Sequence, residues 1–185
     1  MPRTLLSSAS FKGRRSIVDG GFTLVELIAV ISIVGIMAAV CVPAISNLGS
    51  TRDAAAARQM VHDLSYARES SLCSGTRSWI VFDASATTYS LRAENPASPG
   101  QSGASVMRDP SSGNPYSQAF GSGEFAGIGI ASASFDGVPR VGFDWMGRPL
   151  NSSDASLSME GSVMLTGGHG LTVEPGTGFI RFVTP

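Results

Sequence analysis

Residues 21–43 read GFTLVELIAVISIVGIMAAVCVP, an apolar run interrupted near its start by a single carboxylate, Glu26. The basic segment before this run carries Lys12, Arg14 and Arg15. A secretory signal peptide has its cleavage site after the apolar region, beside small residues, whereas the processing point here, Gly21, lies before it. Cleavage after Gly21 would remove residues 1–21 as a basic leader and keep the apolar helix.

The apolar run has the length of a membrane span, which we assign to residues 22–43. Its first 21 residues, at about 1.5 Å each, give roughly 31 Å, the thickness of the hydrocarbon core of a bilayer. By the positive-inside tendency, the basic segment stays on the cytoplasmic side and the chain after Pro43 reaches the opposite face. Pro43 lies inside the predicted helix, so we expect a kink there.

The string Gly21-Phe22-Thr23-Leu24-Val25-Glu26, with its basic flank, apolar span and closing proline, resembles the processing site and N-terminal helix of type IV prepilins and type II secretion pseudopilins. In that family prepilin peptidase cuts after the glycine and methylates the new N-terminus. The resemblance therefore implies cleavage between Gly21 and Phe22 and N-methylation of Phe22. It also implies a single-pass protein of the bacterial inner membrane, with its C-terminal head in the periplasm, that assembles with other pilins or pseudopilins through the N-terminal helix.

Glu26 is predicted to act in that assembly. A carboxylate inside a membrane span costs about 2.5–3.5 kcal/mol, so it faces a partner by default. Cleavage creates a positively charged amine on Phe22, and the amine of a neighbouring subunit would neutralise Glu26 when the helices pack side by side. Two plainer interpretations stay open: Glu26 extends to the membrane interface without a partner, or the segment is a simple anchor.

Residues 44–75 continue the helix with separated faces, giving one long helix of roughly 50 residues. Apolar side chains recur at three and four residues, namely Ile45, Leu48, Ala56, Met60, Leu64 and Ala67. Charged side chains take the other positions: Arg52, Asp53, Arg58, Asp63, Arg68 and Glu69. Ser74-Gly75 ends the helix, because glycine suits the left-handed conformation that follows a helix end.

Residues 76–185 are predicted to form a β-rich head. The predicted strands are short, rich in β-branched and aromatic residues and separated by turn residues; they cover 78–82, 89–91, 127–131, 141–143, 162–166, 171–173 and 179–183. The last three form a meander with tight turns at 167–170 and 174–178. The segment 93–124, rich in Ser, Gly, Pro and Asn, is either a disordered or variable surface insertion or a loop that contacts a partner. The fold class is α+β, with the amphipathic half of the helix covering an antiparallel sheet.

A narrower resemblance concerns the minor pseudopilins of the GspH/FimT branch. The passage from Leu64 to Phe82 is similar to the junction between the helix and first strand of that branch. The segments 143–149 and 171–178 look like its late strands and terminal turn. The resemblance implies a pilin-like fold and a structural role.

No enzymatic chemistry is predicted. His62 sits on the polar side of the helix, and His169 is expected to be a solvated residue of a glycine-rich turn. No motif for a hydrolase, a metalloprotease or a phosphate-binding loop occurs. Four scattered carboxylates fit turn chemistry rather than a calcium site: Asp83, Asp109, Asp136 and Asp144. We therefore expect no cofactor and no metal.

The two cysteines are expected to stay apart within one chain. Cys41 and Cys73 are 32 residues apart, which on one helix is about 48 Å, far beyond the reach of a disulfide. Both are expected to act as small apolar residues. An intermolecular bridge through Cys73 stays open in an oxidising compartment.

Charge separates the remaining function classes. Without residues 1–21 the chain keeps 9 arginines, no lysine and 13 acidic residues, for a net charge of −4. This balance argues against nucleic acid as the main partner, though it leaves room for a small basic patch. We expect a minor pseudopilin of the type II secretion pseudopilus. The alternative is a minor type IV pilin that acts in pilus assembly or DNA uptake, which clustering of Arg140, Arg148 and Arg181 would favour.

Overall fold

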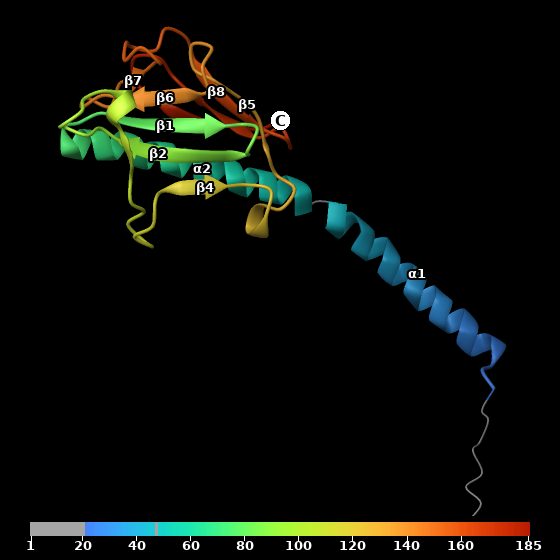
Figure 1. Ribbon diagram of the computed structural model, residues 1–185. Helices are drawn as coiled ribbons and strands as arrows, with labels where there is room; N and C mark the ends of the chain where they lie inside the picture. The colour runs from blue at the N-terminus through green and yellow to red at the C-terminus, as the bar shows by residue number, and fades with distance from the viewer. Residues whose placement is uncertain (1–20, 47) are drawn as a thin grey trace, which may run out of the picture. The chain divides into compact units, whose positions relative to one another are not determined.

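The computed structural model describes the backbone of residues 21–46 and 48–185, and their side chains outside 40–48. The predicted leader, residues 1–21, lies outside the described part except for Gly21. The chain divides at Pro43 into two units, each described by itself. Most of helix α1 (Leu24–Ser46) belongs to the first, whereas helix α2 (Leu48–Ser74) and the described strands belong to the second (Figure 1).

The sequence predicts one continuous helix, and the structure describes helix on both sides of residue 47, so continuity across that residue stays a prediction. α1 ends at Ser46 and α2 begins at Leu48, with residue 47 outside the described part. The helical backbone of α1 continues through Pro43, and the kink expected there stays a prediction. Within the described part of the chain, no helix is both long enough and apolar enough to cross a membrane.

The end of α2 agrees with the sequence prediction. The amide of Gly75 donates to the carbonyl of Ser71 at 3.0 Å. Gly75 has a φ of +69°, the left-handed conformation that glycine adopts without steric cost. The helix therefore stops at Ser74 and the chain turns into the first strand.

The described strands form two antiparallel sheets. The first has the order β3-β2-β1-β6-β7, with β4 also paired to β2, and the second has the order β10-β9-β8-β5. Their bounds are β1 Ser78–Asp83, β2 Thr88–Ala93, β3 Ser105–Val106, β4 Ser117–Ala119, β5 Ile130–Ser134, β6 Arg140–Phe143, β7 Pro149–Leu150, β8 Gly161–Leu165, β9 Gly170–Val173 and β10 Ile180–Val183. The α+β class and the meander β8-β9-β10 are confirmed, whereas the predicted strand 127–131 begins later, as β5.

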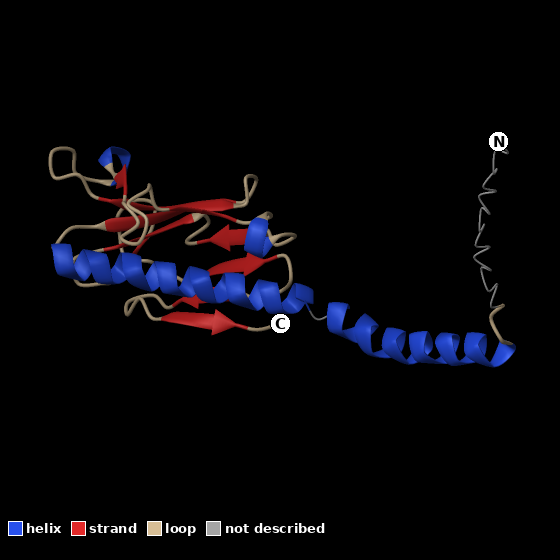
Figure 2. Ribbon diagram, turned by 90° about the horizontal axis from the view of Figure 1, so that it is seen from below, coloured by secondary structure: helices blue, strands red, loops and turns tan. Residues whose placement is uncertain are grey.

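Helix α2 contacts strands of both sheets and provides the shared cover for the core (Figure 2). Its predicted apolar face is confirmed from Ala56 onward, because Ala56, Met60, Leu64 and Ala67 are fully buried. The other two predicted members, Ile45 and Leu48, lie outside the residues whose side chains are described. Arg68, on the same helix, joins two distant turns: its Nε donates to the carbonyl of Gly147 at 2.9 Å and an Nη to the carbonyl of Thr177 at 3.1 Å. The two turns that resemble the late part of a pseudopilin head thus lie against one helix.

The segment 93–124, which we call the insertion, is folded, which excludes disorder. The two other interpretations, a variable surface insertion and a loop that contacts a partner, stay predictions. Strands β3 and β4 of the insertion both pair with β2 and extend the first sheet. Two short 3-10 helices, Gln101–Gly103 and Gly123–Phe125, complete it. The physical reason is local pairing: β2 offers its free edge, and apolar residues such as Phe120 enter the core.

Candidate functional site

The predicted processing junction lies in non-helical backbone directly before α1. Gly21, Phe22 and Thr23 are all exposed, and α1 starts at the next residue, Leu24. A Cβ atom placed on Gly21 would meet nothing within 4 Å. A larger side chain at position 21 would therefore fit the folded chain without a steric clash. A requirement for glycine there would come from a partner that binds the exposed junction.

Thr23 begins α1 as its N-cap, a role that we did not predict from the sequence. The amide of Glu26 donates to Oγ1 of Thr23 at 3.2 Å, and the amide of Leu27 donates to the carbonyl of Thr23 at 3.1 Å. A threonine followed three residues later by glutamate is the capping-box pattern, which was the available signal. The carboxylate of Glu26 lies in the first helical turn, where the helix dipole favours negative charge.

Glu26 is the one charged residue between Leu24 and Ala39, the part of α1 whose side chains are described. It is exposed and makes no ion pair with a described residue. Its large apolar neighbours are exposed as well, with Phe22 at 80% and Val25 at 74%. An exposed apolar surface of this kind marks a contact with another molecule or a membrane, and Glu26 is its single ionic feature.

Asp63 is buried, which corrects its predicted place on the polar face of the helix. Its carboxylate accepts hydrogen bonds from the hydroxyls of Tyr89 at 2.6 Å and Tyr116 at 2.9 Å and from Nε2 of Gln59 at 2.8 Å. Nδ1 of exposed His62 lies 3.2 Å away. Burial is tolerated because several donors replace water around the charge. Asp63 thus fastens the insertion, through Tyr116, to α2.

Asp53 is buried in the same way and corrects the prediction for His169. The carboxylate of Asp53 accepts from the amides of Gly167 at 3.2 Å and His169 at 2.9 Å, and it lies 2.9 Å from Nδ1 of His169. The His169 side chain is only 13% exposed, so it is not a solvated loop residue. A Cβ on Gly167 would lie 2.4 Å from the carboxyl carbon of Asp53, which explains the glycine. His62, in contrast, is exposed as predicted.

Three of the four scattered carboxylates form turn hydrogen bonds, as predicted: Asp83, Asp109 and Asp144. Asp136 differs, because its carboxylate accepts hydrogen bonds from Asn151, Ser158 and Met159, which lie 15 to 23 residues along the chain. The pKa of Asp83 is lowered, first by the hydroxyl of Ser85, and backbone amides do the same for Asp109 and Asp136. For Asp144, burial works against ionisation, but hydrogen bonds led by the amide of Arg148 outweigh it and lower the pKa. Asp83, Asp109 and Asp144 therefore stabilise local backbone turns, whereas Asp136 fastens its own turn to the segment 151–159.

The three arginines whose clustering would favour a DNA-binding pilin come from separate elements of the head. Arg140 lies in β6 of the first sheet and Arg181 in β10 of the second. Arg148 pairs with Asp144 at 2.7 Å, and Arg181 pairs more loosely with Glu174 at 3.9 Å. Clustering of Arg140, Arg148 and Arg181, which would have favoured DNA binding, is therefore not observed.

Cys73 is free and exposed at the end of α2. Cys41 lies outside the residues whose side chains are described. The predicted absence of a bridge between the two cysteines stays a prediction, and so does an intermolecular bridge through Cys73.

Comparison with known proteins gives two findings that agree with this geometry. Residues 19–42 match the family described as the prokaryotic N-terminal methylation motif. The chain is similar in structure to the minor pseudopilin EpsH from the type 2 secretion system of Vibrio cholerae, with a TM-score of 0.51 and 12% sequence identity over 72% of this chain and 98% of that one. A search of curated proteins finds no match. The chain therefore carries a prepilin-type N-terminal motif on a pilin-like fold of the kind seen in a minor pseudopilin.

Proposed function

We propose that this chain is a minor pseudopilin, a non-enzymatic structural subunit of a type II secretion pseudopilus in the bacterial inner membrane. The carrying observation is the pairing of a methylation motif at residues 19–42 with a pseudopilin-like head. Prepilin peptidase would cut between Gly21 and Phe22 and methylate Phe22. The head would then lie in the periplasm, with α1 held in the membrane or among the helices of other pseudopilins.

Exposure of the junction supports the processing step. A peptidase must reach an extended backbone, and Gly21 to Thr23 are exposed and non-helical. The N-cap would survive the cut, because Thr23 and its hydrogen bond to the amide of Glu26 both lie after the scissile bond. Processing would therefore leave the start of α1 intact and add one positive charge at Phe22.

Glu26 would accept that charge from a neighbouring subunit. Its carboxylate has no ionic partner among the described residues, and apolar side chains surround it. In a medium where apolar side chains discriminate poorly between registers, one ionic contact fixes how far two helices slide past each other. The lone carboxylate is thus an assembly contact in this proposal.

The test compares Glu26→Gln and Glu26→Ala with wild type in a host that has prepilin peptidase and partner pseudopilins. Both variants should be processed and recovered with membranes, but their cross-linking to partner pseudopilins should fall at least tenfold. Ser32→Ala is the matched control, because Ser32 also lies in α1 and its hydroxyl donates only to the carbonyl of Ile28 at 2.7 Å. Equal cross-linking of wild type and Glu26→Gln would remove the assembly role.

A minor type IV pilin is the second candidate, because the same motif and fold serve both systems. The net acidic balance and the separation of Arg140 from Arg181 support the secretion subunit over a DNA-binding pilin. The systems are distinguished by deleting the gene and measuring both secretion of a type II substrate and natural transformation. Loss of secretion alone supports the pseudopilin, and loss of transformation alone supports the pilin.

A further inference from the structure

A cavity of about 700 Å³ opens beside the first sheet and contains two arginines, Arg92 and Arg140. Its remaining walls come from the insertion at residues 99–102 and from the loop at residues 152–154. Neither loop belongs to the predicted processing or assembly site. We call this feature the Arg92/Arg140 cavity.

Strand register places both arginines on the same side of the sheet. Arg92 of β2 is paired with Trp79 of β1, and Arg140 of β6 is paired with Val81 of β1. Trp79 and Val81 are two residues apart, so they and their partners point to one face. The opposite face carries the core, which includes Ile80 between them. The two guanidinium groups therefore approach one cavity from either side of β1.

Neither arginine side chain has a hydrogen-bond or ion-pair partner among the residues that the structure describes. The Nε atoms of Arg92 and Arg140 are buried and have no hydrogen-bond acceptor. Within the described part of the chain, neither guanidinium forms an ion pair. Buried donors without acceptors are rare in folded proteins, and two cations in one cavity also repel each other. An anion in the cavity would satisfy both groups at once.

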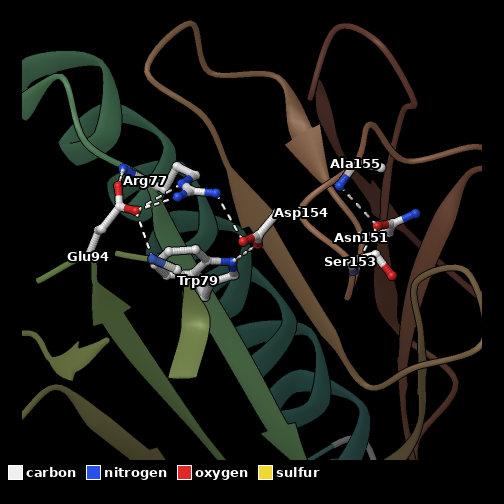
Figure 3. Close-up of polar contacts among 8 residues, drawn as sticks. Arg77, Trp79, Glu94, Asn151, Ser153, Asp154 and Ala155 are labelled. Atoms are coloured by element: carbon white, nitrogen blue, oxygen red, sulfur yellow. Dashed lines mark hydrogen bonds and ion pairs between the residues drawn. The ribbon is translucent and has the colours of Figure 1, made fainter. Parts of the chain in front are cut away.

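Two acidic groups nearby, Glu94 and Asp154, both pair with a third arginine, Arg77 (Figure 3). Arg77 donates to Oε1 of Glu94 from Nε at 3.0 Å and from an Nη at 2.6 Å. Its other Nη donates to Asp154 at 2.9 Å, and the indole of Trp79 donates to the same carboxylate at 3.2 Å. Asp154 lines the cavity, and together with Arg77 and Glu94 it forms a group of net charge −1, because one guanidinium faces two carboxylates. Arg92 and Arg140 add two positive charges, so the five groups together keep a net charge of +1.

The walls of the cavity are held in place before any ligand arrives. Oδ1 of Asn151 accepts the amides of Ser153 at 3.0 Å and Ala155 at 3.2 Å, which fixes the 152–154 loop (Figure 3). On the other side, Glu94 accepts the amide of Gly100 at 3.0 Å. Ser102, Ser152 and Ser153 line the cavity and bring hydroxyl donors near the two arginines. Preorganised donors of this kind lower the cost of binding.

We propose that the Arg92/Arg140 cavity binds a phosphate group. Two guanidinium forks from opposite sides, joined by serine hydroxyls, match a tetrahedral group with several acceptor oxygens better than a planar carboxylate, which one fork satisfies. The cavity volume exceeds what a single phosphate fills, so a diphosphate or an organic phosphate also has room there. This site is separate from α1 and does not depend on the proposed function.

The direct test is calorimetric titration of the full-length chain, kept in a non-ionic detergent, with inorganic pyrophosphate. We expect saturable binding that weakens at least tenfold in Arg92→Gln and in Arg140→Gln. Arg52→Gln is the matched control, because Arg52 is exposed and lies outside the cavity. The proposal is wrong if wild type shows no saturable binding, if the control loses as much affinity as the variants, or if citrate binds as tightly as pyrophosphate.

A second measurement separates binding from folding. Arg140→Met keeps the apolar stem of the side chain and removes its donors, so without pyrophosphate it should melt at or above the wild-type temperature, since an unpaired charge is lost. Added pyrophosphate should raise the melting temperature of wild type and of Arg52→Gln, but not of Arg140→Met. A lower melting temperature for Arg140→Met without ligand would show that Arg140 supports the fold, and would overturn the proposal.

A competition arm identifies the source of the phosphate. A short single-stranded oligonucleotide that displaces pyrophosphate in wild type, but does not bind Arg140→Met, assigns the group to a phosphodiester chain. Failure of the oligonucleotide to displace pyrophosphate assigns it to a small free phosphate compound. Both results keep the phosphate site, whereas oligonucleotide binding that is equal in Arg140→Met and wild type would place that binding elsewhere and count against the cavity.

Discussion

Replacing Asp63 with alanine should destabilise the head more than any surface substitution. The buried hydroxyl of Tyr89 donates to this carboxylate at 2.6 Å, and a hydrogen bond to a charged group contributes about 1.5–3 kcal/mol. Without Asp63 that hydroxyl stays buried without an acceptor. Gln59 and Tyr116 also lose their acceptor, although Tyr116 is half-buried and can turn to water. We expect a total loss of about 3–5 kcal/mol in the free energy of unfolding.

Single substitutions of the two tyrosines measure how much each hydrogen bond contributes to the free energy of unfolding that Asp63→Ala removes. Tyr89→Phe should cost about 1.5–3 kcal/mol, because it leaves a buried carboxylate with one donor fewer, and Tyr116→Phe should cost about 1 kcal/mol, because water replaces the lost donor. Chemical denaturation followed by the fluorescence of buried Trp79 measures each value. Ser65→Ala is the matched control, since its hydroxyl is exposed and bonds only to the carbonyl of Val61. If Asp63→Ala unfolds within 1 kcal/mol of this control, the network does not stabilise the head.

Three further predictions concern processing, the head and pH. Intact-mass measurement should show a mature chain that begins at Phe22 with one methyl group, and Gly21→Val should block this cleavage; a normally cleaved Gly21→Val would make the glycine incidental. A fragment that begins near Asn47 should be soluble, monomeric and mainly β with one helix, and Leu64→Ala in it should cost about 2–5 kcal/mol, because Leu64 is fully buried. The pKa of Tyr89 lies well above its usual range, because burial first and then the Asp63 carboxylate disfavour the phenolate. Since an unfolded tyrosine ionises near pH 10, this contribution to stability is complete below about pH 10 and is lost as the pH rises further. Alkaline unfolding of wild type should therefore be steeper than that of Tyr89→Phe, and parallel curves would contradict the assignment.

The sequence pattern predicted correctly those parts of the fold that depend on local burial and on turn residues. The buried stripe with Met60 and Leu64, the stop at Gly75 and the final meander were readable because burial and turn chemistry leave a local pattern. The division of the strands into two sheets could not be predicted from the sequence pattern. It depends on which strand lies beside β1, and β6 comes from more than 50 residues later in the chain.

Charged residues gave the main errors, since side-chain type alone does not reveal a buried partner. Asp53 and Asp63 look like members of a polar face, yet each accepts hydrogen bonds from groups far along the chain. His169 looks solvated because it stands among glycines, but those glycines let the turn close onto Asp53. The N-terminal site was more accessible to prediction, because its signal is a contiguous string. Its N-cap, Thr23, was available in that string and was overlooked.

Helix α2 contacts residues that follow it closely in the sequence and residues more than 100 positions later, which affects the order in which the head folds. Ser78 donates to the carbonyl of Ala67 across only 11 residues, whereas Arg68 reaches Thr177 across 109 and Asp53 reaches His169 across 116. Contacts this distant form slowly, because a long loop must close first. During synthesis, the apolar face of α2 would therefore stay partly uncovered until β9 and β10 have been made. A chain stalled or cut before residue 170 would present that helix to chaperones and proteases.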